Sequence, residues 1–241
     1  MKRFLFIIFF LYSVALFANQ AMDILKKVDD NTVFSSITYT GTMEVHKNNI
    51  VFSKKFKAYA KGQNKAFIKF INDEDVGVKY LKKGDDLWLA EDEDIVKISG
   101  HLLKNSMMGS DFSYEDSLAN DKLEDLYSAK ILKTESVQNR ECFVIELDAK
   151  KKTAPYKKQI IWVDKTRFIA LKTQYFALSG KLLKEMVTMK TEKISGHYFV
   201  TKIKMINKIR KNNYTLFSMS QIQLNKPVSD SLFTLQHLER E

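Results

Sequence analysis

Apolar and polar residues alternate along most of this chain, which is the pattern of half-buried β-strands. In the stretch SITYTGTMEV, Ile37, Tyr39, Met43 and Val45 share one face, while threonines and a glutamate share the other. The same period of two recurs in later runs near residues 50–60, 64–71, 76–82, 86–90, 95–98, 126–134, 141–149, 157–164, 167–178, 181–193, 198–210 and 214–224. The alternation predicts a mainly β protein with about a dozen strands.

Short turn sequences separate these runs and determine how the strands pair. They are Asn48-Asn49, Gly62-Gln63-Asn64, Gly84-Asp85, Asp164-Lys165, Ser179-Gly180, Ser195-Gly196 and Asn212-Asn213. Links of this length form hairpins, and hairpins join antiparallel neighbours. The two prolines, Pro155 and Pro227, lie between the runs, as a sheet requires.

The fold class follows from the length and continuity of the strands. The runs YFVTKIKMINKIR and YTLFSMSQIQLN are long, and long strands in a continuous meander twist and curl. We expect a strongly curved antiparallel sheet, or half-open β-barrel, with short helices that cover its hydrophobic concave face. One helix is predicted over residues 22–32, where Ile24, Leu25 and Val28 have helical spacing. Because no repeat or linker is seen, residues 19–241 are predicted to form a single domain.

One segment, the insert of residues 97–116 (KISGHLLKNSMMGSDFSYED), breaks the alternation. Its apolar side chains lie among glycines and serines, and they are Leu102, Leu103, Met107, Met108 and Phe112. A helical turn is expected over residues 101–108, and Ser113-x-x-Asp116 resembles a capping box at a helix start. The insert, the N-terminal helix and the tail SDSLFTLQHL are therefore candidates to cover the concave face.

The first residues indicate export. Lys2 and Arg3 precede an almost unbroken apolar run over residues 4–17, which is typical of a secretory signal peptide and short for a membrane span. We expect a signal peptide over residues 1–18, cleaved after Ala18 or, as a second option, after Ala21; an uncleaved anchor is the alternative. The single cysteine, Cys142, cannot form an internal disulfide and is expected in the core. Export without disulfides indicates the periplasm.

The charge and the polar residues exclude several function classes. The formal net charge is +10, but the lysines are spread along the strands, so an exported protein of this kind is not expected to bind nucleic acid. The charge indicates a solvated sheet surface, or attraction to anionic lipid headgroups or an acidic partner. No histidine pair has metal-ligand spacing, and phosphate-loop, dinucleotide and G-x-S-x-G motifs are missing. We therefore expect no catalytic residues, no metal and no cofactor. Trp88 and Trp162 lie in apolar runs, where they pack in the core or line a ligand cavity.

Five segments together carry a family resemblance over nearly the whole chain after residue 18. They are YTGTMEV, GVKYLKKGDDLWL, the insert, YKKQIIWVDKTRFIALKTQYF and GKLLKEMVTMKTEKISGHYFVTKIKM. They resemble the LolA-like family of outer-membrane lipoprotein-sorting proteins, with SMMGSDFSYED as a fairly specific marker. The resemblance implies a half-open barrel with short helices as a lid over a hydrophobic cavity. In the best-known carriers a cavity arginine ties down the lid, whereas the first half of this chain is poor in arginine.

The resemblance also implies a function. We expect a periplasmic carrier or chaperone that binds lipoprotein acyl chains or another lipid and delivers it toward the outer membrane. Its partners would be an inner-membrane permease and an outer-membrane acceptor, and the protein would be a monomer. The expected ligand-binding residues are Leu102, Leu103, Met107, Met108, Phe112, Trp88 and Trp162. The alternatives are an insert that plugs the core permanently, a lipid-binding sensor that regulates a partner in envelope-stress signalling, and an enzyme acting on lipid or glycan.

Overall fold

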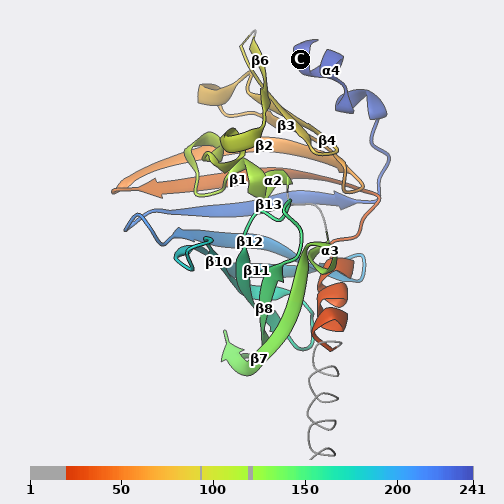
Figure 1. Cartoon of the computed structure of the whole chain (residues 1–241). Helices are drawn as coiled ribbons and strands as arrows, with labels where there is room; N and C mark the ends of the chain where they lie inside the picture. The colour runs from red at the N-terminus through yellow and green to blue at the C-terminus, as the bar shows by residue number, and fades with distance from the viewer. Residues whose placement is uncertain (1–19, 93, 119–121, 241) are drawn as a thin grey trace, which may run out of the picture. The chain divides into compact units, whose positions relative to one another are not determined.

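The computed structural model describes residues 20–92, 94–118 and 122–240 (Figure 1). The strands within these ranges form an antiparallel sheet in the order β6-β5-β4-β3-β2-β1-β13-β12-β11-β10-β9-β8-β7. They are β1 (Ser36–Lys47), β2 (Ile50–Lys61), β3 (Lys65–Phe70), β4 (Lys79–Lys83), β5 (Asp86–Glu91), β6 (Asp94–Ile98), β7 (Tyr127–Val137), β8 (Arg140–Ala149), β9 (Lys158–Asp164), β10 (Ala170–Phe176), β11 (Leu182–Ile194), β12 (His197–Asn207) and β13 (Tyr214–Leu224). β6 and β7 each have one neighbour, so the 13-stranded sheet is not closed. The predicted meander is confirmed, and the insert begins with the last two residues of edge strand β6, Lys97 and Ile98.

The chain divides into two compact units. Unit 1 contains the described residues up to Thr32 and residues 122–185, and unit 2 contains residues 33–118 and 186–240, apart from residue 93. The single domain predicted for residues 19–241 stays a prediction. The predicted signal peptide, residues 1–18, lies outside the described residues.

Unit 1 packs a helix over residues 20–30 against strands β7, β8 and β9. Within the described residues the helix covers positions 20–30 and ends two residues earlier than predicted, and its Ile24 and Leu25 are buried against Ile145 and Ile161. The Asp29 carboxylate at the end of this helix accepts the N–H groups of the residues that begin α3 (Leu123–Leu126), at 3.1 Å each. Burial raises the pKa of Asp29, and the two N–H bonds oppose that shift. This contact joins two segments far apart in sequence.

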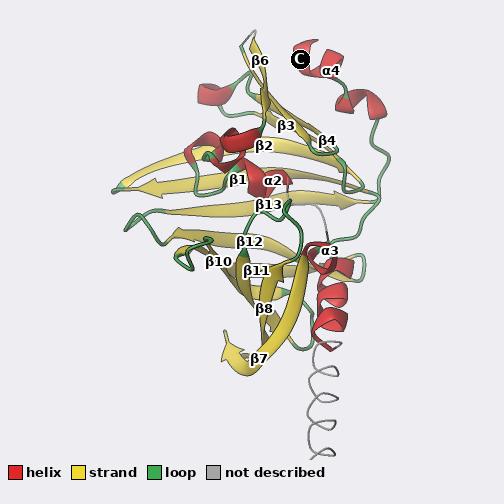
Figure 2. Ribbon diagram, viewed as in Figure 1, coloured by secondary structure: helices red, strands yellow, loops and turns green. Residues whose placement is uncertain are grey.

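Unit 2 has apolar clusters on both faces of its strands. Adjacent residues of β4 show the division, because Tyr80 belongs to one cluster and Leu81 to the other. The first cluster lies under the insert. The second lies under the C-terminal tail, whose elements η4 (Asp230–Phe233) and α4 (Leu235–Arg240) are drawn as helices in Figure 2. The sequence named the tail as a candidate to cover the same face as the insert, but the tail packs on the opposite face of these strands.

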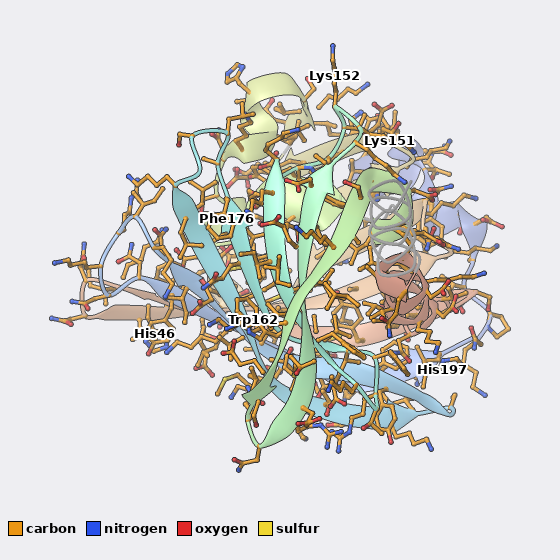
Figure 3. All side chains as sticks on the ribbon, turned by 60° about the horizontal axis from the view of Figure 1, so that its bottom comes forward. His46, Lys151, Lys152, Trp162, Phe176 and His197 are labelled. Carbon is orange, nitrogen blue, oxygen red and sulfur yellow. The ribbon has the colours of Figure 1, made fainter. Side chains whose placement is uncertain are left out.

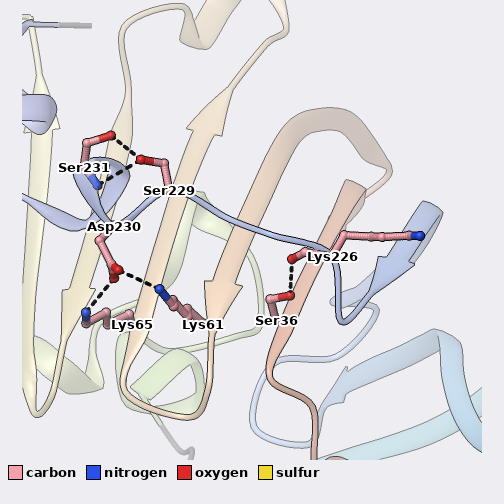
Figure 4. Close-up of polar contacts among 7 residues, drawn as sticks. All are labelled: Ser36, Lys61, Lys65, Lys226, Ser229, Asp230 and Ser231. Carbon is pink, nitrogen blue, oxygen red and sulfur yellow. Dashed lines mark hydrogen bonds and ion pairs between the residues drawn. The ribbon is translucent and has the colours of Figure 1, made fainter.

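Polar contacts hold the tail on unit 2 (Figure 4). The Asp230 carboxylate accepts hydrogen bonds from the ammonium groups of Lys61 at 2.6 Å and Lys65 at 2.9 Å. These ion pairs lower the pKa of Asp230 to about 2. Upstream, the Ser36 hydroxyl donates to the Lys226 carbonyl at 2.5 Å. Beyond them, Phe233 and Leu238 are almost fully buried, so apolar burial and exposed ion pairs act together. No helix within the described part of the chain is both long and apolar enough to cross a membrane.

Candidate functional site

The insert folds into a compact loop made of η2 (Gly100–Lys104), η3 (Met107–Gly109) and the start of α2 (Tyr114–Leu118). Its two arms are joined by backbone hydrogen bonds: the Met107 N–H donates to the Phe112 carbonyl at 2.8 Å, and the Tyr114 N–H donates to the Asn105 carbonyl at 3.1 Å. These bonds satisfy polar backbone groups that would otherwise oppose contact with an apolar surface. The insert can therefore act as one folded piece.

Side-chain hydrogen bonds shape both ends of this loop. The buried Ser110 hydroxyl donates to the Met107 carbonyl at 2.7 Å. At the start of α2, the Asp116 carboxylate accepts from the Ser113 N–H at 2.8 Å and from the Ser113 hydroxyl at 2.9 Å. This contact confirms the helix start predicted from Ser113-x-x-Asp116.

The apolar side chains of the insert pack against one face of unit 2. Met107 is buried, with 8 % of its surface exposed, and the other four are half-buried. The buried residues of the face, together with Met107, form the insert cluster: Met43, Phe56, Ala58, Phe70, Val78, Tyr80, Leu87, Ile98 and Met107. Five of the seven predicted site residues, Leu102, Leu103, Met107, Met108 and Phe112, are thus brought together on one apolar surface.

Aromatic rings form the centre of this surface. The Phe56 ring lies 5.3 Å from Phe70 and 6.2 Å from Phe217, measured between centroids. Phe112 of the insert meets Phe217 edge-on at 6.2 Å. Gly41 on β1 makes room for Phe56, because a Cβ at that position would lie 2.3 Å from the Phe56 ring. The sheet surface is therefore shaped by a close approach that only glycine permits.

One polar anchor ties the insert to β12 and β13. The Thr215 hydroxyl donates to the Asp111 carboxylate at 2.9 Å and accepts the Asp111 N–H at 2.9 Å. The second carboxylate oxygen accepts the Asn207 side-chain N–H at 3.1 Å. Thr215 is fully buried, so these hydrogen bonds form away from water. Asp111, Asn207 and Thr215 are the Asp111 anchor, which ties the insert to the sheet of unit 2.

Three tyrosines bring polar groups into the apolar surface. The hydroxyl oxygens of Tyr80 and Tyr114 are 3.4 Å apart, and burial raises the pKa of Tyr80. Burial likewise raises the pKa of Tyr39 to about 12. The phenols of Tyr80 and Tyr39 are therefore neutral at physiological pH and add no charge to the surface.

Trp88 and Trp162, also predicted as site residues, lie elsewhere. Trp88 on β5 packs in the cluster under the C-terminal tail, on the face opposite the insert. Trp162 on β9 belongs to unit 1 and is labelled in Figure 3. It is buried, and the Lys172 ammonium lies 4.4 Å from its ring centroid. Trp88 therefore belongs to a different cluster of unit 2 from the insert residues, and Trp162 is a residue of unit 1.

Sequence reasoning missed the sheet half of this site. Tyr39 and Met43 were recognised only as members of one face of a half-buried strand, and Asp111 was not recognised as a site residue. Asp111 and Thr215 are 104 residues apart, so their contact had no local signal. A detectable signal was Gly41, because an isolated glycine in a strand marks a close approach.

The site offers apolar contact, and the described residues contain no cluster of three or more His, Cys, Asp or Glu able to hold a metal.

Comparison of the fold places the chain in a structural class. The chain is similar to the crystal structure of a DUF1329 family protein from Desulfovibrio piger, with 26 % sequence identity and a TM-score of 0.85 over 92 % of this chain and 99 % of that chain. It is also similar to an outer membrane lipoprotein-sorting protein domain from Vibrio parahaemolyticus, with 21 % identity and a TM-score of 0.83 over 92 % of this chain and 100 % of that chain. A third similar structure is that of a LolA superfamily protein from Nitrosomonas europaea, with 21 % identity and a TM-score of 0.75 over 90 % of this chain and 98 % of that chain. These likenesses confirm the predicted LolA-like fold, with its open antiparallel sheet and short helices.

Sequence comparison then gives the family. A family model described as "Uncharacterized protein" matches residues 62–240, which is most of the chain, and the chain belongs to that family. No curated protein matches the chain in sequence.

Proposed function

We propose that this protein is a periplasmic carrier that binds lipoprotein acyl chains, or another lipid, between the insert and the insert cluster of unit 2. The main observation in support of the proposal is that five apolar side chains of the insert pack over the apolar face of unit 2. The insert has its own hydrogen bonds and is tied to the sheet by the Asp111 anchor. It can therefore separate from the face as a unit and leave an apolar surface for the cargo.

The energetics favour a reversible exchange between insert and cargo. Burying a large apolar side chain stabilises the closed form by about 1.5–3 kcal/mol, so five such residues contribute roughly 7–15 kcal/mol before entropy is counted. A long acyl chain gains about 0.8 kcal/mol for each buried CH₂, or on the order of 10 kcal/mol in all. Because the two terms are similar in size, the insert and the lipid compete on nearly equal terms. Transfer between membranes requires such reversible binding.

The composition of the insert suits this exchange. Met107 and Met108 are unbranched and polarisable, so they can repack around acyl chains of different shape. Met108 has φ of 50° and Gly109 has φ of 72°, both in the left-handed region. For a methionine this conformation costs about 1 kcal/mol or more, which raises the free energy of the closed form. The closed insert is therefore held in place without being locked.

The proposed route needs export and two docking partners. We assign residues 1–18 to a signal peptide and residues 19–241 to a single mature domain in the periplasm, acting as a monomer. A lipid-exporting permease of the inner membrane would load the carrier, and an acceptor at the outer membrane would receive the cargo. Apolar binding between the insert and the face accounts for the site without a catalytic step.

The first test is mass spectrometry of organic extracts from the protein purified from the periplasm without detergent. A stoichiometric lipid or acylated peptide is expected, and its identity would name the cargo. Uptake of a fluorescent fatty acid by the purified protein provides a second readout. A clean extract together with no uptake would mean that the insert is a permanent plug, and the proposal would be abandoned.

A further inference from the structure

Two neighbouring hairpins of unit 2 end in exposed turns. The β1–β2 hairpin turns at residues 48–49, and the connection between β12 and β13 covers residues 208–213. β1 pairs with β13 as far as His46 and Tyr214, so the two turns lie side by side (Figure 1; Figure 3, where His46 is labelled). Residues 48–51 and 208–213 are together called the hairpin tips.

Large apolar side chains at the hairpin tips are exposed to solvent. Ile50 exposes 67 % of its surface, Val51 exposes 57 % and Ile209 exposes 54 %. Single exposed apolar residues are common on protein surfaces, but three on adjoining turns form a patch that favours contact with an apolar phase. The hairpin tips would therefore gain free energy if such a phase covered them.

Cationic side chains accompany these apolar residues. Lys208, Arg210 and Lys211 lie in the β12–β13 connection and are exposed. Along strands β1, β2, β12 and β13 and the two turns that join them, Glu44 is the single carboxylate. Lysine and arginine strengthen binding to anionic bilayers, where their charges stay among the headgroups while their methylene groups contact apolar atoms. The hairpin tips are thus complementary to a bilayer that contains anionic lipids.

The β12–β13 connection holds its side chains in a defined arrangement. The Asn207 side-chain oxygen accepts the N–H groups of Ile209 at 2.9 Å and of Arg210 at 2.8 Å. The backbone N–H of Asn207 donates to the Asn213 carbonyl at 3.0 Å and closes the connection. One asparagine therefore fixes both an apolar and a cationic residue of the tip, which reduces the conformational freedom lost when the tip meets a surface.

The same asparagine joins the hairpin tips to the insert. The Asn207 side-chain amide donates to the Asp111 carboxylate at 3.1 Å, within the Asp111 anchor. The insert also approaches the other hairpin, because a Cβ at Gly109 would lie 3.4 Å from the Phe52 ring and 3.7 Å from the Lys47 ammonium nitrogen. A surface that contacts the hairpin tips would therefore lie close to the insert.

We propose that the hairpin tips dock the protein on a bilayer that contains anionic lipids. Their three apolar side chains enter the headgroup region, and their three cationic side chains lie among the lipid phosphates. This docking deepens the proposed carrier function, and its role in transfer rests on that function. It brings the insert to the membrane surface, so an acyl chain passes between the bilayer and the insert cluster with little exposure to water.

Co-sedimentation of the mature protein with vesicles tests the docking. Vesicles that contain phosphatidylglycerol should bind the protein more tightly than vesicles of phosphatidylcholine, and added salt should reduce the difference. Ile50→Thr combined with Ile209→Thr should weaken binding to phosphatidylglycerol vesicles by about tenfold or more, because both apolar contacts are reduced while the β-branched shape is kept. Val96→Thr, at an exposed apolar position on β6, is the control and should bind like the wild type.

The cationic side chains are tested separately. Arg210→Gln combined with Lys211→Gln should weaken binding to phosphatidylglycerol vesicles by about fivefold for each cation and should leave binding to phosphatidylcholine unchanged. Lys151→Gln combined with Lys152→Gln is the matched control, since these two exposed lysines, labelled in Figure 3, are also adjacent and carry the same charge. Thermal unfolding shows whether each variant remains folded. Equal losses in the variants and their controls would overturn the proposal.

Transfer of a fluorescent fatty acid from the loaded protein to vesicles separates the docking from the carrier function. The isoleucine double variant should transfer the fatty acid more slowly, with unchanged affinity for it in solution. Vesicle binding without fatty-acid uptake would uphold the docking and overturn the carrier function. Uptake without vesicle binding would overturn the docking and uphold the carrier. Binding to native membranes but not to protein-free vesicles would also overturn the docking, because it would indicate a protein receptor.

Discussion

The Thr215 hydroxyl and the Asp111 carboxylate form a reciprocal contact, in which Thr215 donates to the carboxylate and accepts the Asp111 N–H, both at 2.9 Å. Thr215 is fully buried in the sheet, whereas Asp111 belongs to the insert. The contact is thus a polar link between the apolar face and the segment that covers it. Its strength bears directly on how readily the insert opens.

Thr215→Val tests this link, because valine keeps the shape of threonine and removes the hydroxyl. The closed form should lose about 1–3 kcal/mol, since two polar groups of Asp111 lose their partner. If the insert competes with lipid, the affinity for a fluorescent fatty acid should rise by about tenfold. Thr42→Val on β1 is the control and should leave binding unchanged. Weaker fatty-acid binding in Thr215→Val alone would contradict a competing insert.

Met107→Asp combined with Met108→Asp should abolish fatty-acid binding while the sheet remains folded, because two charges would face the acyl chain. Binding is measured by fluorescence and folding by circular dichroism. Lys104→Asp, an exposed change in the same insert, is the control for added negative charge. Loss of the cooperative unfolding transition in the methionine variant would instead mean that the insert is a permanent part of the core.

Gly41→Ala should lower the free energy of unfolding by about 1–3 kcal/mol, because the new methyl group would overlap the Phe56 ring. Urea unfolding measures the change. Replacing the Phe56 ring with the smaller leucine side chain in Gly41→Ala/Phe56→Leu should recover part of the lost stability. The effects of the two substitutions on the free energy of unfolding will therefore not be additive. Additive effects would show that Gly41 and Phe56 do not compete for the same space.

The tail should detach more readily at low pH. The pKa of Asp230 is lowered from 3.8 to about 2 by Lys61 and Lys65, so the folded form binds its proton less readily than the unfolded form. The stabilisation is complete above pH 3.8 and is lost as the pH falls through about 2. The protection of the α4 amides against hydrogen exchange, relative to the intrinsic exchange rate at each pH, should therefore fall as the pH is lowered through this interval in the wild type.

Asp230→Asn provides the comparison for the tail. This variant should exchange faster at pH 7 and should lose the part of the pH dependence that Asp230 causes. Because the pairs are exposed, added salt should reduce the difference between the two proteins. Identical exchange in the tail of both proteins at pH 7 and low salt would show that apolar burial of Phe233 and Leu238 alone holds it.

The sequence by itself determined the strands, most of the turns and the unusual character of the insert. Strand alternation is a local property with a period of two, and turn residues act through their own backbone preferences, so neither needs distant contacts. The same holds for the helix start at Ser113, where donor and acceptor are three residues apart. The local pattern was also sufficient to place Cys142 in the core, where its burial is complete.

Only the tertiary structure decided which faces meet. Trp88 and Trp162 fit the pattern of buried strand residues equally well on either face. The structure places Trp88 in the cluster under the tail, on the face of unit 2 opposite the insert, and Trp162 in unit 1. The contact of Asp111 with Thr215 spans 104 residues. The stack of His46 on Tyr214 spans 168 residues. The alternation of apolar and polar residues indicates only that neighbouring residues lie on opposite faces of the sheet. Which partners it meets there depends on strand order and register, and these are properties of the whole sheet.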